Sequence, residues 1–302
     1  MINKNKYEEY TLLLGKGFAL NVYLPALIET NCKKIVLDLS SKKYIGSNIH
    51  NKDIKWINEN EIQENNFSKI IIAEPPQKQF KLIKDRSLWK NCNNFILEKP
   101  IAENHNKAKH LIEMLNERKI KYSVNYTFRY TKWLRKIYDY IHNNLDDGEI
   151  KVNWKFMGRH LQKKKSTWKT NHELGGGAIK YYGIHLIAIL SDIGYKEVKS
   201  INIFNQPTNK INSWSCTFDS TNKLPLLKLN IDSSSVYNQF NWQQRNKSIL
   251  NLETPFSLES IEYNYDKRIP PVIKFLQEEN TKLLNLQNMN ALQLWSKIES
   301  MI

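Results

Sequence analysis

The sequence predicts an α/β protein in which a doubly wound parallel sheet is followed by an α+β domain with an open, largely antiparallel sheet. Short apolar runs alternate with helical segments over the first 124 residues, which is typical of a parallel sheet. From residue 198 onward, strand-like segments follow one another with short turns, which is typical of antiparallel pairing. We therefore expect one domain over residues 1–124 and a second over residues 125–302.

The N-terminal strands are expected where apolar residues run together, because a strand that is buried on both faces carries a continuous apolar run. Helices are expected where apolar residues recur on one face. The expected strands are residues 10–14, 35–37, 70–73, 95–97 and 122–124, and the expected helices are residues 21–30, 57–63, 80–89 and 106–119.

The C-terminal part begins with a helix over residues 133–142 and a strand over 149–158, followed by a long loop over 159–174. A helix then follows the glycine run Gly175-Gly176-Gly177. The remaining expected strands are residues 198–204, 213–218, 224–231, 240–245, 248–253 and 258–263, and the last expected helices are residues 270–278 and 289–302.

Composition gives ordinary globular values, with 41% hydrophobic and 25% charged residues among 302. No window is apolar enough to predict a membrane span, and the first residues lack the apolar core of a signal peptide. The three cysteines, Cys32, Cys92 and Cys216, are odd in number and widely spaced. This favours free thiols in a reducing compartment, so we expect a cytoplasmic protein without a metal site.

The net charge of +15 has three interpretations. It fits a nucleic-acid or membrane partner, an anionic substrate such as a phosphorylated or nucleotide-linked sugar, or a compositional bias toward Lys, Asn and Ile. The basic residues are scattered, and only Lys163-Lys164-Lys165 forms a tight run. We therefore expect neither a nucleic-acid nor a membrane partner.

A glycine turn follows the first expected strand and precedes the first expected helix. It reads Gly15-Lys16-Gly17-Phe18-Ala19-Leu20, which is part of the dinucleotide fingerprint of Rossmann-type sheets. Gly15 can make the tight turn, and Gly17 lets the backbone approach a pyrophosphate at the helix N-terminus. Leu20 stands where the fingerprint has a third small residue, so we expect the helix to lie further from the strand.

Asp38 ends the second expected strand, at a distance where a carboxylate can accept hydrogen bonds from the adenosine ribose. This favours NAD. The residues that follow, Ser40, Ser41, Lys42 and Lys43, could instead hold a 2′-phosphate and favour NADP, or form a solvated loop.

Further candidates also follow strand ends, because ligands lie at the carboxyl ends of parallel strands. They are Pro75, Glu98 with Lys99 and Pro100, and Asn125. In the second domain, Tyr181 and His185 are four residues apart and would share one helical face. Such a pair suits proton transfer, although a packed tyrosine and a hydrogen-bonded core histidine would give the same spacing.

Together these groups resemble the Gfo/Idh/MocA family, which includes glucose–fructose oxidoreductase and inositol dehydrogenase. The resemblance covers nearly the whole chain. The matching pieces are Gly15-Lys16-Gly17, Ile72-Ala73-Glu74-Pro75-Pro76, Glu98-Lys99-Pro100, Asn125-Tyr126-Thr127-Phe128-Arg129, Gly148-Glu149-Ile150, Trp168, Gly175-Gly176-Gly177-Ala178 and Gly183-Ile184-His185. It implies a nucleotide-binding domain, a substrate-binding and oligomerisation domain, and a homo-oligomer formed through the open sheet face.

The resemblance also implies residue roles. Lys99 would polarise or deprotonate the reacting oxygen, Pro100 would shape the loop beneath the nicotinamide, and His185 would act as acid or base or orient the sugar. The residues expected to bind the cofactor are Gly15, Gly17, Phe18, Ala19, Asp38, Ser40, Glu74, Pro75, Glu98, Lys99 and Pro100. The residues expected to bind the substrate are Asn125, Arg129, Trp168, Tyr181 and His185.

Several positions depart from the family pattern. Tyr181 stands where relatives often carry an aspartate, and some sugar ketoreductases of the family use a tyrosine there. Glu74 replaces a small residue and could repel pyrophosphate or bind a ribose hydroxyl. Tyr23 and Gln79 stand where relatives commonly have histidine. Tyr181 favours reduction of a keto-sugar, whereas the other changes could also mean altered specificity or a lost active site.

The sequence thus predicts an NAD(P)-dependent oxidoreductase that acts on the hydroxyl or ketone carbon of a sugar or nucleotide sugar. Lys99, Tyr181 and His185 would handle the proton. The alternative is a non-catalytic member of the fold that senses a sugar or dinucleotide and regulates a partner. A third hypothesis, nucleic-acid binding driven by the net charge, lacks a recognition motif.

Overall fold

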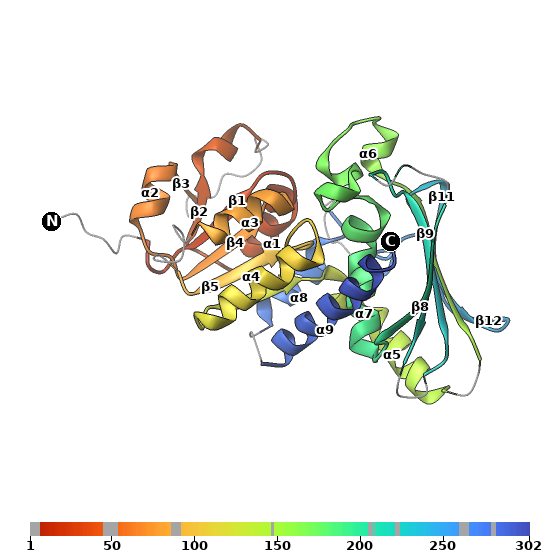
Figure 1. Cartoon of the computed structure of the whole chain (residues 1–302). Helices are drawn as coiled ribbons and strands as arrows, with labels where there is room; N and C mark the ends of the chain where they lie inside the picture. Colours follow the sequence, from red (N-terminus) through yellow and green to blue (C-terminus); the bar gives the residue numbers. More distant parts are fainter. Residues whose placement is uncertain are drawn as a thin grey trace. The chain divides into compact units, whose positions relative to one another are not determined.

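The structure is a computed structural model that divides into two units (Figure 1). Unit 1 comprises residues 1–102, 107–125 and 261–285, and unit 2 comprises residues 103–106, 126–260 and 286–302. The residues described are 7–44, 54–85, 92–145, 148–204, 207, 209–220, 224–259, 266–278 and 282–302. No helix among them is both long enough and apolar enough to cross a membrane.

Unit 1 is built on a six-stranded sheet in the order β3-β2-β1-β4-β5-β6, and every neighbouring pair is parallel. The strand order reverses at β1, the switch point where ligands bind in such sheets. This confirms the doubly wound prediction. The strands are β1 (Thr11–Gly15), β2 (Ile35–Asp38), β3 (Ile54–Ile57), β4 (Lys69–Ala73), β5 (Asn94–Glu98) and β6 (Lys121–Asn125).

The helices of unit 1 come from two distant parts of the chain. A π-helical turn η1 (Ala19–Tyr23) continues into α1 (Leu24–Glu29). Helix α8 (Ile269–Gln277) comes from the C-terminal part and packs against both η1 and α1. The other elements are η2 (Leu39–Tyr44), α2 (Glu59–Glu64), α3 (Pro76–Lys84) and α4 (His105–Glu117), whose first two residues belong to unit 2.

Unit 2 contains a mixed sheet in the order β12-β11-β7-β10-β9-β8, with only the β7–β10 pair parallel among the pairs described. The prediction of a largely antiparallel sheet is confirmed. The strands are β7 (Ile150–Met157), β8 (Glu197–Ile203), β9 (Ser213–Asp219), β10 (Leu227–Asp232), β11 (Ser234–Gln244) and β12 (Lys247–Leu252). Residues 260–263 of the last expected strand lie outside the described residues, as do residues 86–89 of the helix expected over 80–89.

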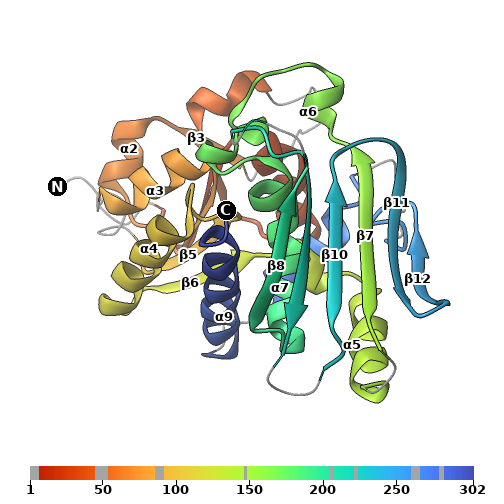
Figure 2. The same cartoon turned by 45° about the vertical axis from the view of Figure 1, so that its right-hand side comes forward.

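Helix α7 (Ile184–Ile193) lies against one face of this sheet (Figure 2), and nine of its ten side chains are buried. The loop expected over residues 159–174 contains short helices instead. The remaining helices of unit 2 are η3 (Thr127–Tyr130), α5 (Leu134–Asn143), α6 (Arg159–Gln162), η4 (Trp168–Thr170), η5 (His172–Leu174), η6 (Ala178–Gly183) and α9 (Lys282–Glu299), which begins in unit 1.

Candidate functional site

The turn after β1 can be made only by glycine. Gly15 has a φ of +128°, and a Cβ placed on it would overlap the carbonyl oxygen of Ala73 in the neighbouring strand β4. The same Cβ would lie 3.1 Å from the Cβ of Ala19. The helix therefore approaches the strand closely, with Ala19 as the small residue at the contact. The expectation that Leu20 holds the helix away from β1 is wrong, because the π-helical turn brings Ala19 to this position.

The backbone at Gly17 is open, since a Cβ placed there would meet no atom within 4 Å. Asn21 donates from its side-chain amide to the Gly17 carbonyl at 2.7 Å, which holds the turn against the first residues of the helix. The start of a helix carries amide groups that point outward and a positive end of the dipole. Open backbone at such a helix start fits the pyrophosphate of a dinucleotide.

Asp38 is held in a local turn at the end of β2. Its carboxylate accepts from the Ser40 amide and from the Ser40 hydroxyl, each at 2.8 Å. Its orientation is thereby fixed, and a carboxylate retains further lone pairs for ribose hydroxyls. Nearby, the ammonium of Lys16 lies 4.8 Å from the ring centre of Tyr44, and that of Lys43 lies 5.4 Å from it.

The Glu74 carboxylate is neutralised by a lysine one helical turn onward. Its Oε1 lies 2.5 Å from the ammonium of Lys78 in α3, and the Glu74 side chain is only 10% exposed. Pro75 follows as the N-cap of α3. Because Lys78 compensates the charge, Glu74 repels an anion less than an unpaired carboxylate would.

Glu98, at the end of β5, is a buried carboxyl. Burial raises its pKa to about 7, while the charges of Lys99 and Arg268 oppose the shift. Its Oε1 accepts from the Lys99 amide at 3.0 Å, and its Oε2 accepts from the Asn125 side chain at 3.4 Å. Asn125, an expected substrate ligand, is thus fully buried against Glu98.

The loop that carries Lys99 is clamped by Gln79. This fully buried side chain donates to the carbonyls of Glu98, at 2.8 Å, and Ile101, at 3.1 Å. It also accepts from the Glu98 amide at 3.0 Å. The Lys99–Pro100 peptide bond within this loop is cis. Gln79 therefore sets the backbone on both sides of Lys99, a role that the sequence did not indicate.

Arg268 is a residue of unit 1 that the sequence analysis missed. It precedes α8, and its guanidinium carbon lies 5.1 Å from the ring centre of Phe18, directly after the Gly17 turn. It is 250 residues from Phe18 in the chain, so no local motif could reveal it. Its charge also acts on Glu98.

In unit 2, Tyr181 lies on the π-helix η6 and packs edge-on against Trp168, with ring centres 5.3 Å apart. The ammonium of Lys169 lies 5.3 Å from the Tyr181 ring centre. Tyr181 is half-buried, so one part of the side chain meets solvent. Two expected substrate residues, Trp168 and Tyr181, are thereby in contact.

The three glycines before η6 serve packing. The amides of Gly175 and Gly176 donate to the carbonyls of His172 and Asn171, at 3.1 and 2.8 Å. A Cβ on Gly176 would overlap the Trp168 carbonyl, and Gly177 has a φ of +78°. The chain itself therefore uses the amide donors of Gly175 and Gly176.

His185 lies in the core of unit 2. Only 7% of it is exposed, and its ring stacks on Phe128 with centres 4.6 Å apart and planes 14° apart. The stacking fixes the plane of the imidazole. Tyr181 and His185 thus occupy different environments, one at the surface of unit 2 and one inside it.

Arg129 is engaged within unit 2. Its guanidinium makes a two-point ion pair with Asp192, at 2.7 and 3.0 Å, and donates to the Asn288 side chain at 2.7 Å. The side chain is 6% exposed. These contacts give Arg129 a structural role, and its expected substrate contact stays a prediction.

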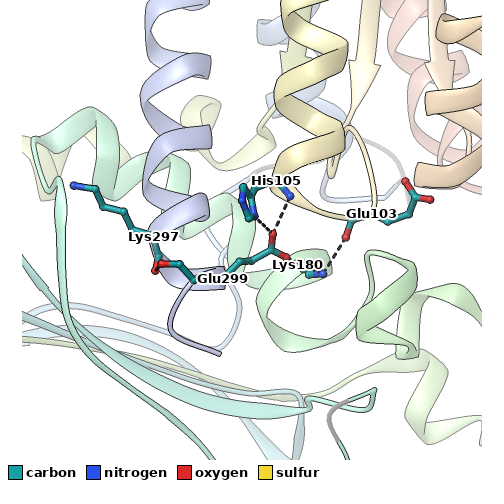
Figure 3. Close-up of polar contacts among 6 residues, drawn as sticks. Glu103, His105, Lys180, Lys297 and Glu299 are labelled. Carbon is teal, nitrogen blue, oxygen red and sulfur yellow. Dashed lines mark hydrogen bonds and ion pairs between the residues drawn. The ribbon is translucent and has the colours of Figure 1, made fainter.

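Lys180, which precedes Tyr181 in the chain, belongs to a buried group of charges (Figure 3). The Lys180 ammonium is 2.7 Å from the Glu299 carboxylate and donates to the Glu103 carbonyl at 3.0 Å. Glu299 also accepts from the backbone amide and the Nδ1 of His105, at 2.8 and 2.5 Å. Burial alone would raise the pKa of Glu299, but the Lys180 charge and these hydrogen bonds leave it lowered.

The chain matches neither a protein-family model nor a curated protein sequence. Solved structures share its fold over nearly the whole length. The WlbA dehydrogenase from Bordetella pertussis, in complex with NADH and UDP-GlcNAcA, has a TM-score of 0.70 at 11% identity, over 98% of this chain and 97% of that chain. GenD2 from gentamicin A biosynthesis, in complex with NAD, has a TM-score of 0.72 at 10% identity, over 100% and 97%.

A super-repressor mutant of Gal80p from Saccharomyces cerevisiae has a TM-score of 0.74 at 12% identity, over 97% of this chain and 94% of that chain. The predicted resemblance is confirmed at the level of the fold, because these matches are Gfo/Idh/MocA-type structures. At such identities the likeness establishes the fold alone, and one fold hosts different functions.

Proposed function

We propose that the chain is an oxidoreductase that uses NAD(H) or NADP(H) to move a hydride to or from a hydroxyl- or carbonyl-bearing carbon of a sugar or nucleotide sugar. The observation that carries the proposal is the fit of unit 1 to a dinucleotide. The Gly15 turn, the open backbone at Gly17 and the loop with Lys99 all follow the carboxyl ends of strands in one parallel sheet. The NAD and NADH in GenD2 and WlbA support the cofactor class.

The proposed domains are residues 1–124 for dinucleotide binding and residues 125–302 for substrate binding and oligomerisation, apart from Asn125 and residues 261–285, which belong to unit 1. Asp38 favours NAD(H), since a fixed carboxylate suits a ribose diol better than a 2′-phosphate. The WlbA complex with UDP-GlcNAcA supports a nucleotide sugar as one substrate class. The net charge of +15 is compatible with such an anion.

The chemistry is a hydride transfer at C4 of the nicotinamide, which the cofactor supplies when bound. In the reducing direction, the Tyr181 phenol gives its proton to the substrate oxygen, and the Lys99 ammonium stabilises the negative charge that develops there. With the reduced cofactor supplying the hydride to the ketone carbon, the Tyr181 proton would complete the alcohol. His185 would orient the substrate or relay the proton from inside unit 2, where its ring is stacked on Phe128.

Titration with NADH and NADPH tests the proposal, following energy transfer from tryptophan to the nicotinamide. We expect saturable binding, and turnover with a keto-sugar that falls at least about a hundredfold in Lys99→Ala. The matched control is Lys81→Ala, an exposed lysine on α3. If neither dinucleotide binds, the proposal fails.

The second candidate is a regulatory protein that binds a sugar or dinucleotide without turnover. The likeness to Gal80p supports it, because that structure is of a super-repressor. Dinucleotide binding without turnover of any keto- or hydroxy-sugar would favour this candidate. Turnover that Lys99→Ala abolishes would exclude it.

A further inference from the structure

We propose that Arg268 is an anion-binding residue of the dinucleotide site, where its guanidinium holds the pyrophosphate. This inference rests on the proposed function and deepens it by adding a ligand from the C-terminal part of the chain. Every contact that carries it lies within unit 1.

Arg268 is placed at the glycine turn after β1. The guanidinium carbon of Arg268 lies 5.1 Å from the ring centre of Phe18, the residue after Gly17. The pyrophosphate of a dinucleotide lies against such a glycine turn at the helix start. Helix α8 packs on η1 and α1, the helix that this turn begins, so Arg268 is held at the turn by secondary structure.

The guanidinium of Arg268 is pre-organised by Asp266. Nε of Arg268 donates to the Asp266 carboxylate at 2.8 Å, its Nη2 pairs with the other oxygen, and its backbone amide donates to the same side chain at 3.0 Å. An arginine whose fork is already oriented loses little side-chain entropy when it binds an anion. Its side chain is 36% exposed, so a ligand can reach it.

The charges beside Arg268 also favour an anion. Among the described residues, Asp266 pairs with Arg268, and the charges of Arg268 and Lys99 both act on Glu98. Asp266 is already paired with Arg268, and the raised pKa of Glu98 leaves that carboxyl incompletely ionised near neutral pH. The two basic groups therefore outweigh the negative charge of the two carboxyl groups, which favours an anion. A capping arginine stacked on Phe18 would make the same contacts without binding an anion, and the affinity for dinucleotide separates the two roles.

The test compares Arg268→Ala, Arg268→Lys and the control Lys267→Ala, the exposed neighbour with the same charge. NADH and ADP-ribose are the probes, since both carry the pyrophosphate and only NADH carries nicotinamide. We expect Kd for both probes to rise at least about tenfold in Arg268→Ala, because a hydrogen bond to a charged group is lost. Arg268→Lys should lose less, and Lys267→Ala should bind as wild type.

Wild-type affinity of a folded Arg268→Ala or Arg268→Lys for both probes would overturn the inference while leaving the proposed function intact. Weakened NADH binding with unchanged ADP-ribose binding would also overturn it, because the arginine would then serve the nicotinamide half. If wild-type protein binds neither NADH nor NADPH, the proposed function itself fails. Near-ultraviolet circular dichroism identifies any variant that does not fold.

Discussion

The ammonium of Lys180 lies 2.7 Å from the carboxylate of Glu299, and both side chains are more than nine-tenths buried. This pair joins the π-helix that carries Tyr181 to the last turn of α9, nearly 120 residues onward in the chain. Desolvation makes a buried ion pair weak evidence for net stability, but removal of one partner leaves an unpaired buried charge. The pair therefore makes the position of η6 sensitive to the last turn of α9.

We expect Lys180→Met and Glu299→Gln each to destabilise unit 2 by about 3–5 kcal/mol. The free energy of unfolding by urea, followed by far-ultraviolet circular dichroism, is the measurement. A control pair is Arg135 and Asp139 on α5, whose side chains are 87% and 52% exposed. Breaking that pair should cost less than about 1 kcal/mol. Equal effects for the two pairs would contradict the prediction.

The charge of Lys180 also acts on His172, a buried histidine whose titration should make the protein sensitive to acid. Burial, with a further contribution from the Lys180 charge, lowers the pKa of His172 to about 4, from its ordinary 6.5. As the pH falls, the His172 imidazole is protonated near pH 6.5 in the unfolded chain, but only near pH 4 in the folded unit. Stability should therefore fall as the pH drops from 6.5 to 4, by on the order of 3 kcal/mol.

We expect His172→Phe to flatten this part of the curve of Tm against pH, because phenylalanine does not titrate. The control is His142→Phe, an exposed histidine on α5, which should leave the curve unchanged. A wild-type slope between pH 6.5 and 4 in His172→Phe would show that another group is responsible.

The titration of Glu98 predicts that cofactor binding weakens as the pH rises, whereas stability is expected to fall as the pH drops. Burial raises its pKa to about 7, so the carboxyl becomes fully negative only as the pH rises above this value. A new negative charge beside Lys99 and Arg268 disfavours a dinucleotide. We expect Kd for NADH to increase several-fold between pH 6 and 8.5 in wild type. Glu98→Gln should remove most of this pH dependence. If Kd for NADH still changes with pH in Glu98→Gln as in wild type, another group is responsible.

The sequence predicted those parts of the fold in which neighbours along the chain decide the structure. Continuous apolar runs revealed β1, β2, β4, β5 and β6, because these strands are buried on both faces. Edge strand β3 was missed, since Lys55 interrupts its short run and most of it is only partly buried. The assignment of α8 to unit 1 depends on long-range packing, which periodicity does not report.

In the candidate site too, the sequence predicted only those features that neighbours along the chain decide. The glycine turn and the Glu98-Lys99-Pro100 loop were visible as local motifs. The π-helical turn η1 was not, because i→i+5 bonding leaves no distinct sequence pattern, and it moves the small contact residue to Ala19. Lys180 was overlooked since lysine is almost never buried unless paired, and its partner Glu299 is distant in the chain.

The two glycines of the turn after β1 should respond differently to alanine. Gly15→Ala places a Cβ against the Ala73 carbonyl at a φ of +128°, so we expect loss of stability as well as of NADH binding. Gly17→Ala meets no protein atom within 4 Å, so the variant should fold with a wild-type Tm. Its added methyl group should nevertheless fill space proposed for the pyrophosphate and raise Kd for NADH at least about tenfold. Thermal unfolding and energy-transfer titration on the two variants separate these effects. Wild-type NADH affinity in Gly17→Ala would place the cofactor away from this turn and count against the proposed site.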